Sequence, residues 1–192
     1  MAVSANRTRA PERARAATRA RLRESGQRLF AERGLHAVTS HEIADGAGVA
    51  AGTFYLHFPD KHALFRELVF EAIEELQRRL ERELVPLEGQ REAAARARAE
   101  VLLTFAEEQG ELVRLAFGRG SEAASVGADA LDALAARLET DHPAVEAQAI
   151  VGMWARVVSW WAARPGRAPR DEVLRTMIDV QLSGFAMRRS TP

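Results

Sequence analysis

The sequence contains no cysteine, one tyrosine and a single lysine. Without a thiol, the chain cannot form a disulfide, a thiolate metal site or a cysteine nucleophile. The longest apolar run, from Ala149 to Ala155, is far too short to span a membrane. The arginine-rich N-terminus also lacks the apolar core of a signal peptide. We therefore expect a cytoplasmic protein that makes no contact with a membrane.

The five histidines give no sign of a metal site or of catalysis, because they are scattered along the chain. His57 and His62 are five residues apart, so they do not share one helical face as a pair of metal ligands would. No nucleophile stands beside a base in a recognisable pattern. We expect neither an enzyme nor a cofactor or metal. An enzyme built on a helical bundle remains a less favoured alternative, which a cavity with several converging acid or base groups would support.

The composition favours an all-α fold, because alanine, leucine, glutamate and arginine are abundant and the strand signal is weak. The formal net charge is zero, but the charge is unevenly distributed. Residues 1–62 hold nine arginines and one lysine against six carboxylates, a net charge of +4, which leaves −4 for the remainder. This asymmetry is typical of a basic DNA-contacting end joined to an acidic body.

Apolar spacing and helix start and stop signals predict about nine helices. The first 14 residues contain Pro11 and have little to bury, so we expect a mobile basic arm there. The predicted helices span residues 15–33, a short stretch from 40, then 51–57, 61–84, 90–109, 111–117, 122–140, a stretch from the start signal at 141–143 to 164, and 170–187.

The segment from Thr39 to Lys61 carries the most informative pattern. Thr39 and Glu42 have the spacing of a capping box, in which each side chain bonds the backbone N–H of the other. Glycines end the following helix within two turns, and Gly48 can take the left-handed conformation of a tight turn. A second short helix follows, and Asp60 caps a longer one. Two short helices around a glycine turn form the helix-turn-helix pattern of DNA binding.

This region, from about Arg21 to Val69, resembles the TetR-type (tetracycline-repressor-like) bacterial transcriptional regulators. Beyond Val69 the resemblance rests only on length and helical character. It implies a helix-turn-helix DNA-binding domain at residues 15–62 and a helical effector-binding and dimerisation domain at 63–192. The joint spacing of the following residues carries the resemblance: Leu29 to Gly34, Thr39-Ser40, Ile43-Ala44, Ala47 to Val49, Gly52 to Tyr55, His57-Phe58, Lys61 and Leu64.

The resemblance implies that Thr39, Tyr55 and Lys61 donate hydrogen bonds to DNA phosphates, with His57 as a possible fourth donor. Lys61 has an independent argument, since a cation in the first turn of a helix opposes the helix dipole. Its position is explained if the ammonium and the helix end face a phosphate together. The alternative is an ordinary solvated lysine. The phenylalanines beside Tyr55 and His57 are expected in the core.

The leading end of the second short helix, the expected base-reading helix, consists of Ala50, Ala51, Gly52 and Thr53. Many members of the family carry serine and a lysine, arginine or proline where this chain has Ala50 and Ala51. Alanine methyl groups can contact thymine methyls but donate no hydrogen bond. We therefore expect modest direct readout, with greater reliance on the arm, on Thr53 and on DNA shape.

The apolar C-terminal helices suggest two further tasks, dimerisation and ligand binding. The family is dimeric, and a dimer reads a two-fold symmetric operator through two helices about one DNA turn apart. The last two helices would pair with their copies as a four-helix bundle, using Trp160, Trp161, Leu174, Met177, Ile178 and Phe185. A ligand cavity inside each subunit would use Leu102, Phe105, Phe117, Met153 and Trp154. Alternatively, these side chains simply fill the core.

The sequence therefore predicts a homodimeric DNA-binding transcriptional regulator. The favoured interpretation is a repressor that a small apolar or amphipathic effector releases from its operator. The alternative is a DNA-binding dimer with no small-molecule effector, controlled by a protein partner or by its own abundance.

Overall fold

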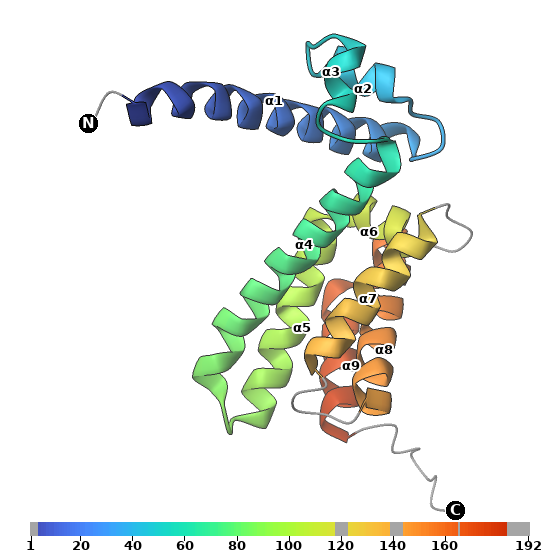
Figure 1. Ribbon diagram of the computed structural model, residues 1–192. Coiled ribbons are helices and arrows are strands. Elements are labelled where there is room, and N and C mark those ends of the chain that lie inside the picture. The colour runs from blue at the N-terminus through green and yellow to red at the C-terminus, as the bar shows by residue number, and fades with distance from the viewer. Residues whose placement is uncertain (1–3, 118–122, 139–143, 165, 184–192) are drawn as a thin grey trace, which may run out of the picture.

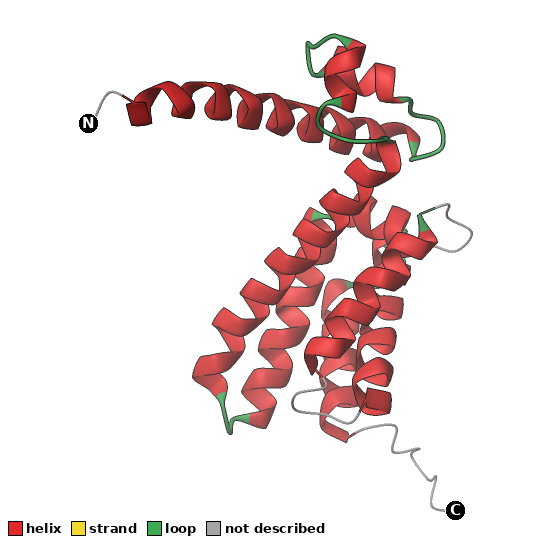
Figure 2. Ribbon diagram, viewed as in Figure 1, coloured by secondary structure: helices red, strands yellow, loops and turns green. Residues whose placement is uncertain are grey.

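The computed structural model describes residues 4–117, 123–138, 144–164 and 166–183. Within these ranges the chain forms nine α-helices, one short 3-10 helix and no strand, which confirms the predicted all-α class (Figure 2). The helices are α1 (Ser4–Arg33), α2 (Ser40–Gly46), α3 (Ala51–Tyr55), α4 (Lys61–Leu84), the 3-10 helix η1 (Val85–Leu87), α5 (Arg91–Glu108), α6 (Gly110–Phe117), α7 (Ala124–Leu138), α8 (Ala144–Ala162) and α9 (Arg170–Ser183).

Helices α1, α2 and α3 lie together at one end of the molecule, which we call the head, and α5 to α9 form the body (Figure 1). Helix α4 joins the two, because it packs against α1 in the head and against α5 and α7 in the body. In the body, α5 lies along α9 and α7 lies along α8. The last described helix therefore packs against the middle of the chain.

The start of α1 was predicted incorrectly. The helix begins at Ser4, so residues 4–14, expected to be a mobile arm, are helical in the structure. The sequence argument gave too much weight to Pro11, which lies inside this helix, and too little to the surrounding alanines and arginines, which are strong helix formers. Helix α4 has the predicted bounds, and α9 is described to Ser183, so its predicted last turn lies outside the described residues.

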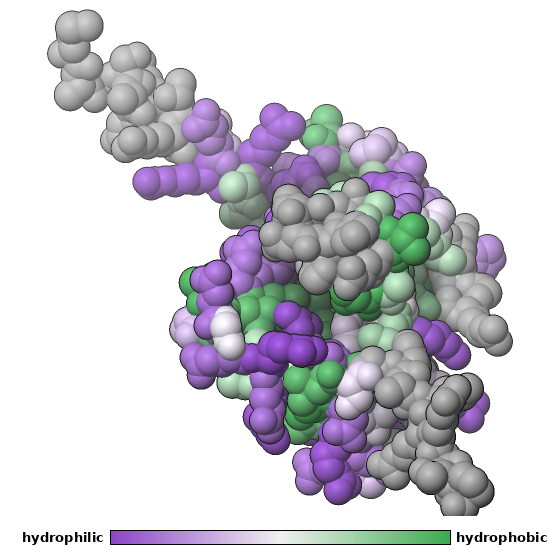
Figure 3. All heavy atoms as spheres, turned by 90° about the horizontal axis from the view of Figure 1, so that it is seen from below, coloured by the Kyte–Doolittle hydropathy of each residue, from purple (hydrophilic) through white to green (hydrophobic). Residues whose placement is uncertain are grey.

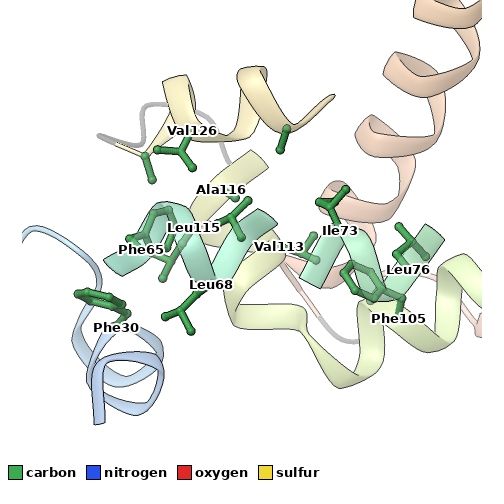
Figure 4. Close-up of a cluster of buried hydrophobic side chains, with 14 of the residues drawn as sticks. Phe30, Phe65, Leu68, Ile73, Leu76, Phe105, Val113, Leu115, Ala116 and Val126 are labelled. Atoms are coloured by element: carbon green, nitrogen blue, oxygen red, sulfur yellow. The ribbon is translucent and has the colours of Figure 1, made fainter. Parts of the chain in front are cut away.

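The apolar stripe of α4 supplies buried side chains to both the head and the body. Near its start, the ring of Phe65 meets the ring of Phe30 from α1 edge-on, with centroids 5.7 Å apart. Further along, Ile73 and Leu76 lie beside Phe105 of α5 (Figure 4). All five side chains belong to one buried cluster, so a single continuous core runs from the head into the body.

Helices α6 and α7 approach each other so closely that only glycine fits at their contact. A Cβ atom added at Gly127 of α7 would overlap the carbonyl oxygen of Ala116 in α6. Gly152 of α8 is different, because a Cβ atom there would meet nothing within 4 Å. Two glycines inside helices therefore have opposite structural roles, one required by packing and one not.

We predict opposite effects for Gly127→Ala and Gly152→Ala on the free energy of unfolding. The first change forces two backbones apart, which costs about 1–3 kcal/mol. The second adds a better helix former in open space and stabilises by up to about 1 kcal/mol. Urea unfolding followed by circular dichroism measures both, and equal stability of the two variants would contradict the close contact of α6 with α7.

Candidate nucleic-acid interface

The predicted capping box at the start of α2 is present. The Glu42 N–H donates to the Thr39 hydroxyl oxygen at 3.2 Å, and the Glu42 carboxylate accepts from the Thr39 N–H at 2.8 Å. These bonds, together with Arg33 at 2.7 Å, lower the pKa of Glu42 to about 2. The Thr39 hydroxyl also donates to this carboxylate at 2.8 Å. A phosphate contact by Thr39, which stays a prediction, would have to replace that bond.

The turn between α2 and α3 has the predicted left-handed glycine, since Gly48 has a φ of +65°. Ala44 of α2 is fully buried there. Phe54 and Phe58 are buried as expected, with exposed fractions of 0% and 2%. Because these two rings hold α3 against the head, the remaining side chains of this short helix face outward.

The outward face of α3 is apolar and almost bare. Ala50 is exposed, and the space around Gly52 is empty to 4 Å. Tyr55 is 52% exposed, and the residue that follows α3, Leu56, is 72% exposed. The sequence prediction did not include Leu56 among the exposed contact residues. Its position between the two buried phenylalanines, Phe54 and Phe58, could have indicated that it faces outward. Ala51 and Thr53 are half-buried, so the surface offers methyl groups, the Thr53 hydroxyl and the Tyr55 phenol but no charge.

Lys61 anchors the start of α4 to the first part of the α1–α2 connection. Its ammonium donates to the backbone carbonyls of Leu35 at 2.9 Å and His36 at 3.2 Å. From the sequence, Lys61 was predicted either to contact a phosphate or to be solvated. Neither prediction included these bonds to backbone carbonyls. An ammonium has three donors, so one remains for a phosphate, and that role stays a prediction.

His57 lies in the turn between α3 and α4 and is held there by α1. The Arg19 guanidinium donates to the His57 carbonyl at 2.9 Å and lies 4.3 Å from the Phe58 ring centroid. Burial, with Arg15 and Arg19 nearby, lowers the pKa of His57. Its Nδ1 is buried without a hydrogen-bond partner, so a neutral ring would carry its proton on Nε2. A single N–H could then serve the predicted phosphate contact.

The residues predicted to line one ligand cavity are separated in the structure. Met153 and Trp154 line an apolar groove of about 450 Å³ between α8 and α9. Leu102 and Phe105 are buried in the core instead, and Phe117 is half-buried at the end of α6. The groove also contains two members of the predicted dimer set, Trp160 and Met177.

Most of the residues predicted for the dimer interface are buried within a single subunit. Trp161, Leu174, Met177 and Ile178 have exposed fractions of 9%, 7%, 1% and 7%, so their side chains already pack inside their own subunit. Phe185 lies outside the described residues. Helix α8 is apolar around much of its circumference, so spacing alone cannot tell which of its stripes is buried, whereas the main apolar stripe of α9 is buried in its own subunit. Any interface at α8 and α9 must use the half-buried side chains that line the groove, such as Trp160.

A second groove, of about 690 Å³, runs between α4 and α5 and is lined by charged side chains. Arg79 pairs with Glu75 at 2.9 Å and with Glu108 at 2.5 Å. Hydrogen bonds within this set lower the pKa of Glu75 and raise the pKa of Arg79. General acid–base catalysis needs pKa values near the working pH, and these move away from it. The groove gives no support to an enzyme.

The described residues show neither a metal cluster nor a membrane-spanning helix. They contain no group of three or more His, Asp or Glu side chains arranged to hold a metal ion. None of the described helices combines the length and apolar character needed to cross a membrane.

The head matches known DNA-binding regulators in sequence. Residues 22–68 match the family model of bacterial regulatory proteins, tetR family. The chain is 47% identical over 51 residues to the HTH-type transcriptional repressor KstR2 of Mycobacterium tuberculosis, covering 27% of this chain and 26% of that protein. It is 41% identical over 51 residues to the HTH-type transcriptional regulator AcrR of Shigella flexneri, covering 27% and 24%. The match thus spans about a quarter of these relatives.

Solved structures resemble the whole fold at lower sequence identity. A putative TetR-family regulator from Syntrophomonas wolfei has a TM-score of 0.70 at 16% identity, covering 86% of this chain and 93% of that chain. FadR of Thermus thermophilus, a TetR-family transcriptional repressor solved with lauroyl-CoA, has a TM-score of 0.62 at 21% identity, covering 91% and 98%. At these identities the likeness concerns the fold.

We predict that Glu42→Gln changes how stability depends on pH. The folded-state pKa of Glu42 is lowered from 4.5 to about 2, so its ionised form stabilises the fold above pH 4.5. That contribution is lost as the pH falls through about 2. The melting temperature of the wild type should therefore exceed that of the variant at neutral pH, and the difference should shrink below pH 4.5. Parallel melting profiles from neutral pH down to about 2 would contradict this.

Proposed function

The chain belongs to the tetR family of bacterial regulatory proteins, and on this premise we propose that it is a homodimeric transcriptional repressor released from its operator by a small apolar or amphipathic effector. One observation carries the proposal. The head presents α3 outward on a helix-turn-helix frame, and α4 joins that frame to a separate helical body.

In this proposal residues 15–62 bind DNA and residues 63–192 bind the effector and a second subunit. Helix α3 enters the major groove, where its alanines and Leu56 contact thymine methyl groups. Phosphate contacts from Thr39, Tyr55, His57 and Lys61 fix the register but carry no sequence information. The apolar outward face of α3 supports a modest direct readout, supplemented by DNA shape.

The groove between α8 and α9 supports dimerisation. Met153, Val157, Trp160 and Val180 line it as half-buried apolar side chains on the surface of a single subunit. A second copy with the same stripe would cover this apolar surface through a two-fold symmetric contact. Two heads would then face a two-fold symmetric operator, about one DNA turn apart.

We predict a sequence-specific complex with the DNA upstream of the chain's own coding sequence. Gel-shift titration should show a complex whose affinity falls steeply as salt rises, because phosphate contacts release counterions. Absence of a salt-sensitive, sequence-specific complex with that DNA would count against the proposal.

Val157→Arg serves as a dimerisation variant in the same experiment. A charge in the groove leaves the subunit folded, since the side chain is only half-buried, but prevents a second copy from packing there. We expect a monomer by sedimentation and a loss of operator binding. A variant that remains dimeric would place the interface elsewhere.

Two observations support an effector. FadR of Thermus thermophilus was solved with lauroyl-CoA and FadR of Bacillus subtilis with stearoyl-CoA, and both share this fold. In α4, Gln77 is only 8% exposed, and its carbonyl oxygen is buried without a hydrogen-bond partner. An amide or hydroxyl of a ligand would satisfy this oxygen. Such a ligand shifts α4, and thereby the head, only as far as its affinities for the two states differ.

We predict that long-chain acyl-CoA stabilises the protein against heat and weakens its operator complex. Binding to the folded state raises the melting temperature by mass action. Gln77→Leu should keep operator binding and lose most of the effector response, because leucine has a similar shape and no acceptor. If no acyl-CoA or other amphipathic compound shifts the melting temperature, the alternative is favoured, a DNA-binding dimer controlled by a protein partner or by abundance.

A further inference from the structure

Helix α1 continues well beyond the other helices of the head. In Figure 1 it projects toward the N-terminus past α2 and α3, and Figure 3 shows hydrophilic side chains on its described protruding part. Every residue from 11 to 17 is exposed. This part of the helix makes no contribution to the core, so packing does not explain why it carries arginines.

The arginines of α1 fall into two kinds. Arg19 and Arg23 are neutralised by ion pairs with Glu67 and Glu71 of α4 and hold the head to that helix. Arg15 and Arg21 are exposed, and neither makes an ion pair within the described part of the chain. Arg15 and Arg21 therefore keep their full charge, as does the exposed Arg13.

These two free arginines lie at opposite ends of α3. Arg15 lies one helical turn before Arg19, whose guanidinium donates to the His57 carbonyl at 2.9 Å, so it lies on the side of α1 that faces the turn after α3. Its charge also contributes to the lowered pKa of His57. Arg21 lies at the turn that precedes α3, where its Nη1 is 4.0 Å from the position of a Cβ atom on Gly48. Its guanidinium also reaches the hydroxyl of Thr18 at 3.4 Å.

We propose that Arg15 and Arg21 bind backbone phosphates of the operator on the two sides of α3. The inference rests on the proposed DNA-binding function and adds two positioning residues to it. The outward face of α3 carries no charge, so it contributes little of the electrostatic attraction that dominates protein–DNA affinity. Guanidinium groups at both of its ends supply that attraction and hold the short helix in register.

Arg13 provides a matched control on the same helix. It is exposed and has no ion pair within the described residues, like Arg15. Because the two are two residues apart, their side chains point about 200° apart around the helix axis. Arg15 points to the side on which α3 and α4 pack, so Arg13 points away from it. Net charge and local helix composition are therefore equal in the two single variants.

The experiment compares Arg15→Gln, Arg21→Gln, their double variant and Arg13→Gln with the wild type. Affinity for a labelled duplex of the chain's own upstream DNA is measured by fluorescence anisotropy between about 50 and 200 mM salt, the range in which phosphate contacts change binding strongly. Each lost phosphate contact lowers the slope of log affinity against log salt by about 0.9. Because the proposed homodimer carries each substitution twice, a single variant should lose about 1.8 and the double variant about 3.6. The affinity deficit of the double variant should therefore shrink by about a hundredfold across the range. Arg13→Gln should keep the wild-type slope.

A duplex with a scrambled operator sequence separates positioning from readout. Because phosphate contacts carry no sequence information, the double variant should keep the wild-type ratio between the two duplexes. Equal slope losses for Arg13→Gln and Arg15→Gln would overturn the inference, since net charge alone would then explain the effect. An unchanged slope in a double variant with the wild-type circular dichroism melting curve would also overturn it. Absence of salt-sensitive binding by the wild type would instead overturn the proposed function.

Discussion

The structure depends on the burial of one helix in two places. Helix α4 packs Phe65 against Phe30 in the head and packs Ile73 and Leu76 beside Phe105 in the body. Because both contacts belong to one rigid helix, a displacement of its buried middle has to move its first turn. That turn carries Lys61, whose ammonium holds the α1–α2 connection by two backbone carbonyls. The orientation of the head is therefore fixed by the packing of the body, which is the mechanical requirement for any regulation of the head by the body.

The features that the sequence predicted well are those with local causes. The capping box of α2, the left-handed Gly48 and the Asp60 cap that begins α4 each involve groups within a few residues of one another. The errors concern features with distant causes. The start of α1 was misplaced because Pro11 is a local signal that the surrounding helix overrides. The sequence could not tell which apolar side chains of α8 and α9 are buried within one subunit, because only the packing of the whole body decides this.

The predicted DNA-contacting residues illustrate the same limit within the site. Their identities came from a family resemblance, but their local bonds could not, since the carbonyl of Leu35 that Lys61 holds is 26 residues away. The structure shows that Thr39 and Lys61 are already engaged in the head, the first with Glu42 and the second with two carbonyls. The Lys61 ammonium keeps one N–H and is already held in place, so it would lose little conformational freedom on meeting a phosphate, which lowers the entropic cost of binding. The same bonds restrict how many donors remain, so the head needs further cations to reach a useful affinity.

The need for further cations explains the different roles proposed for α1 and α3 in the head. In the proposed function, a five-residue α3 whose outward side chains are methyl groups, one hydroxyl and one phenol would distinguish bases mainly through methyl contacts, and such contacts are worth less than bidentate hydrogen bonds to base edges. Affinity for DNA would then come mainly from contacts with the DNA phosphates. The unpaired guanidinium groups on α1 are exposed on the same head. In the proposed function, such a protein would hold DNA by charge and select its site by shape and by thymine pattern. Its specificity would then depend on the two heads of the proposed dimer being held at a fixed separation, because the small contributions of the two heads act together. Control of that separation through α4 would therefore act directly on the specificity of DNA binding.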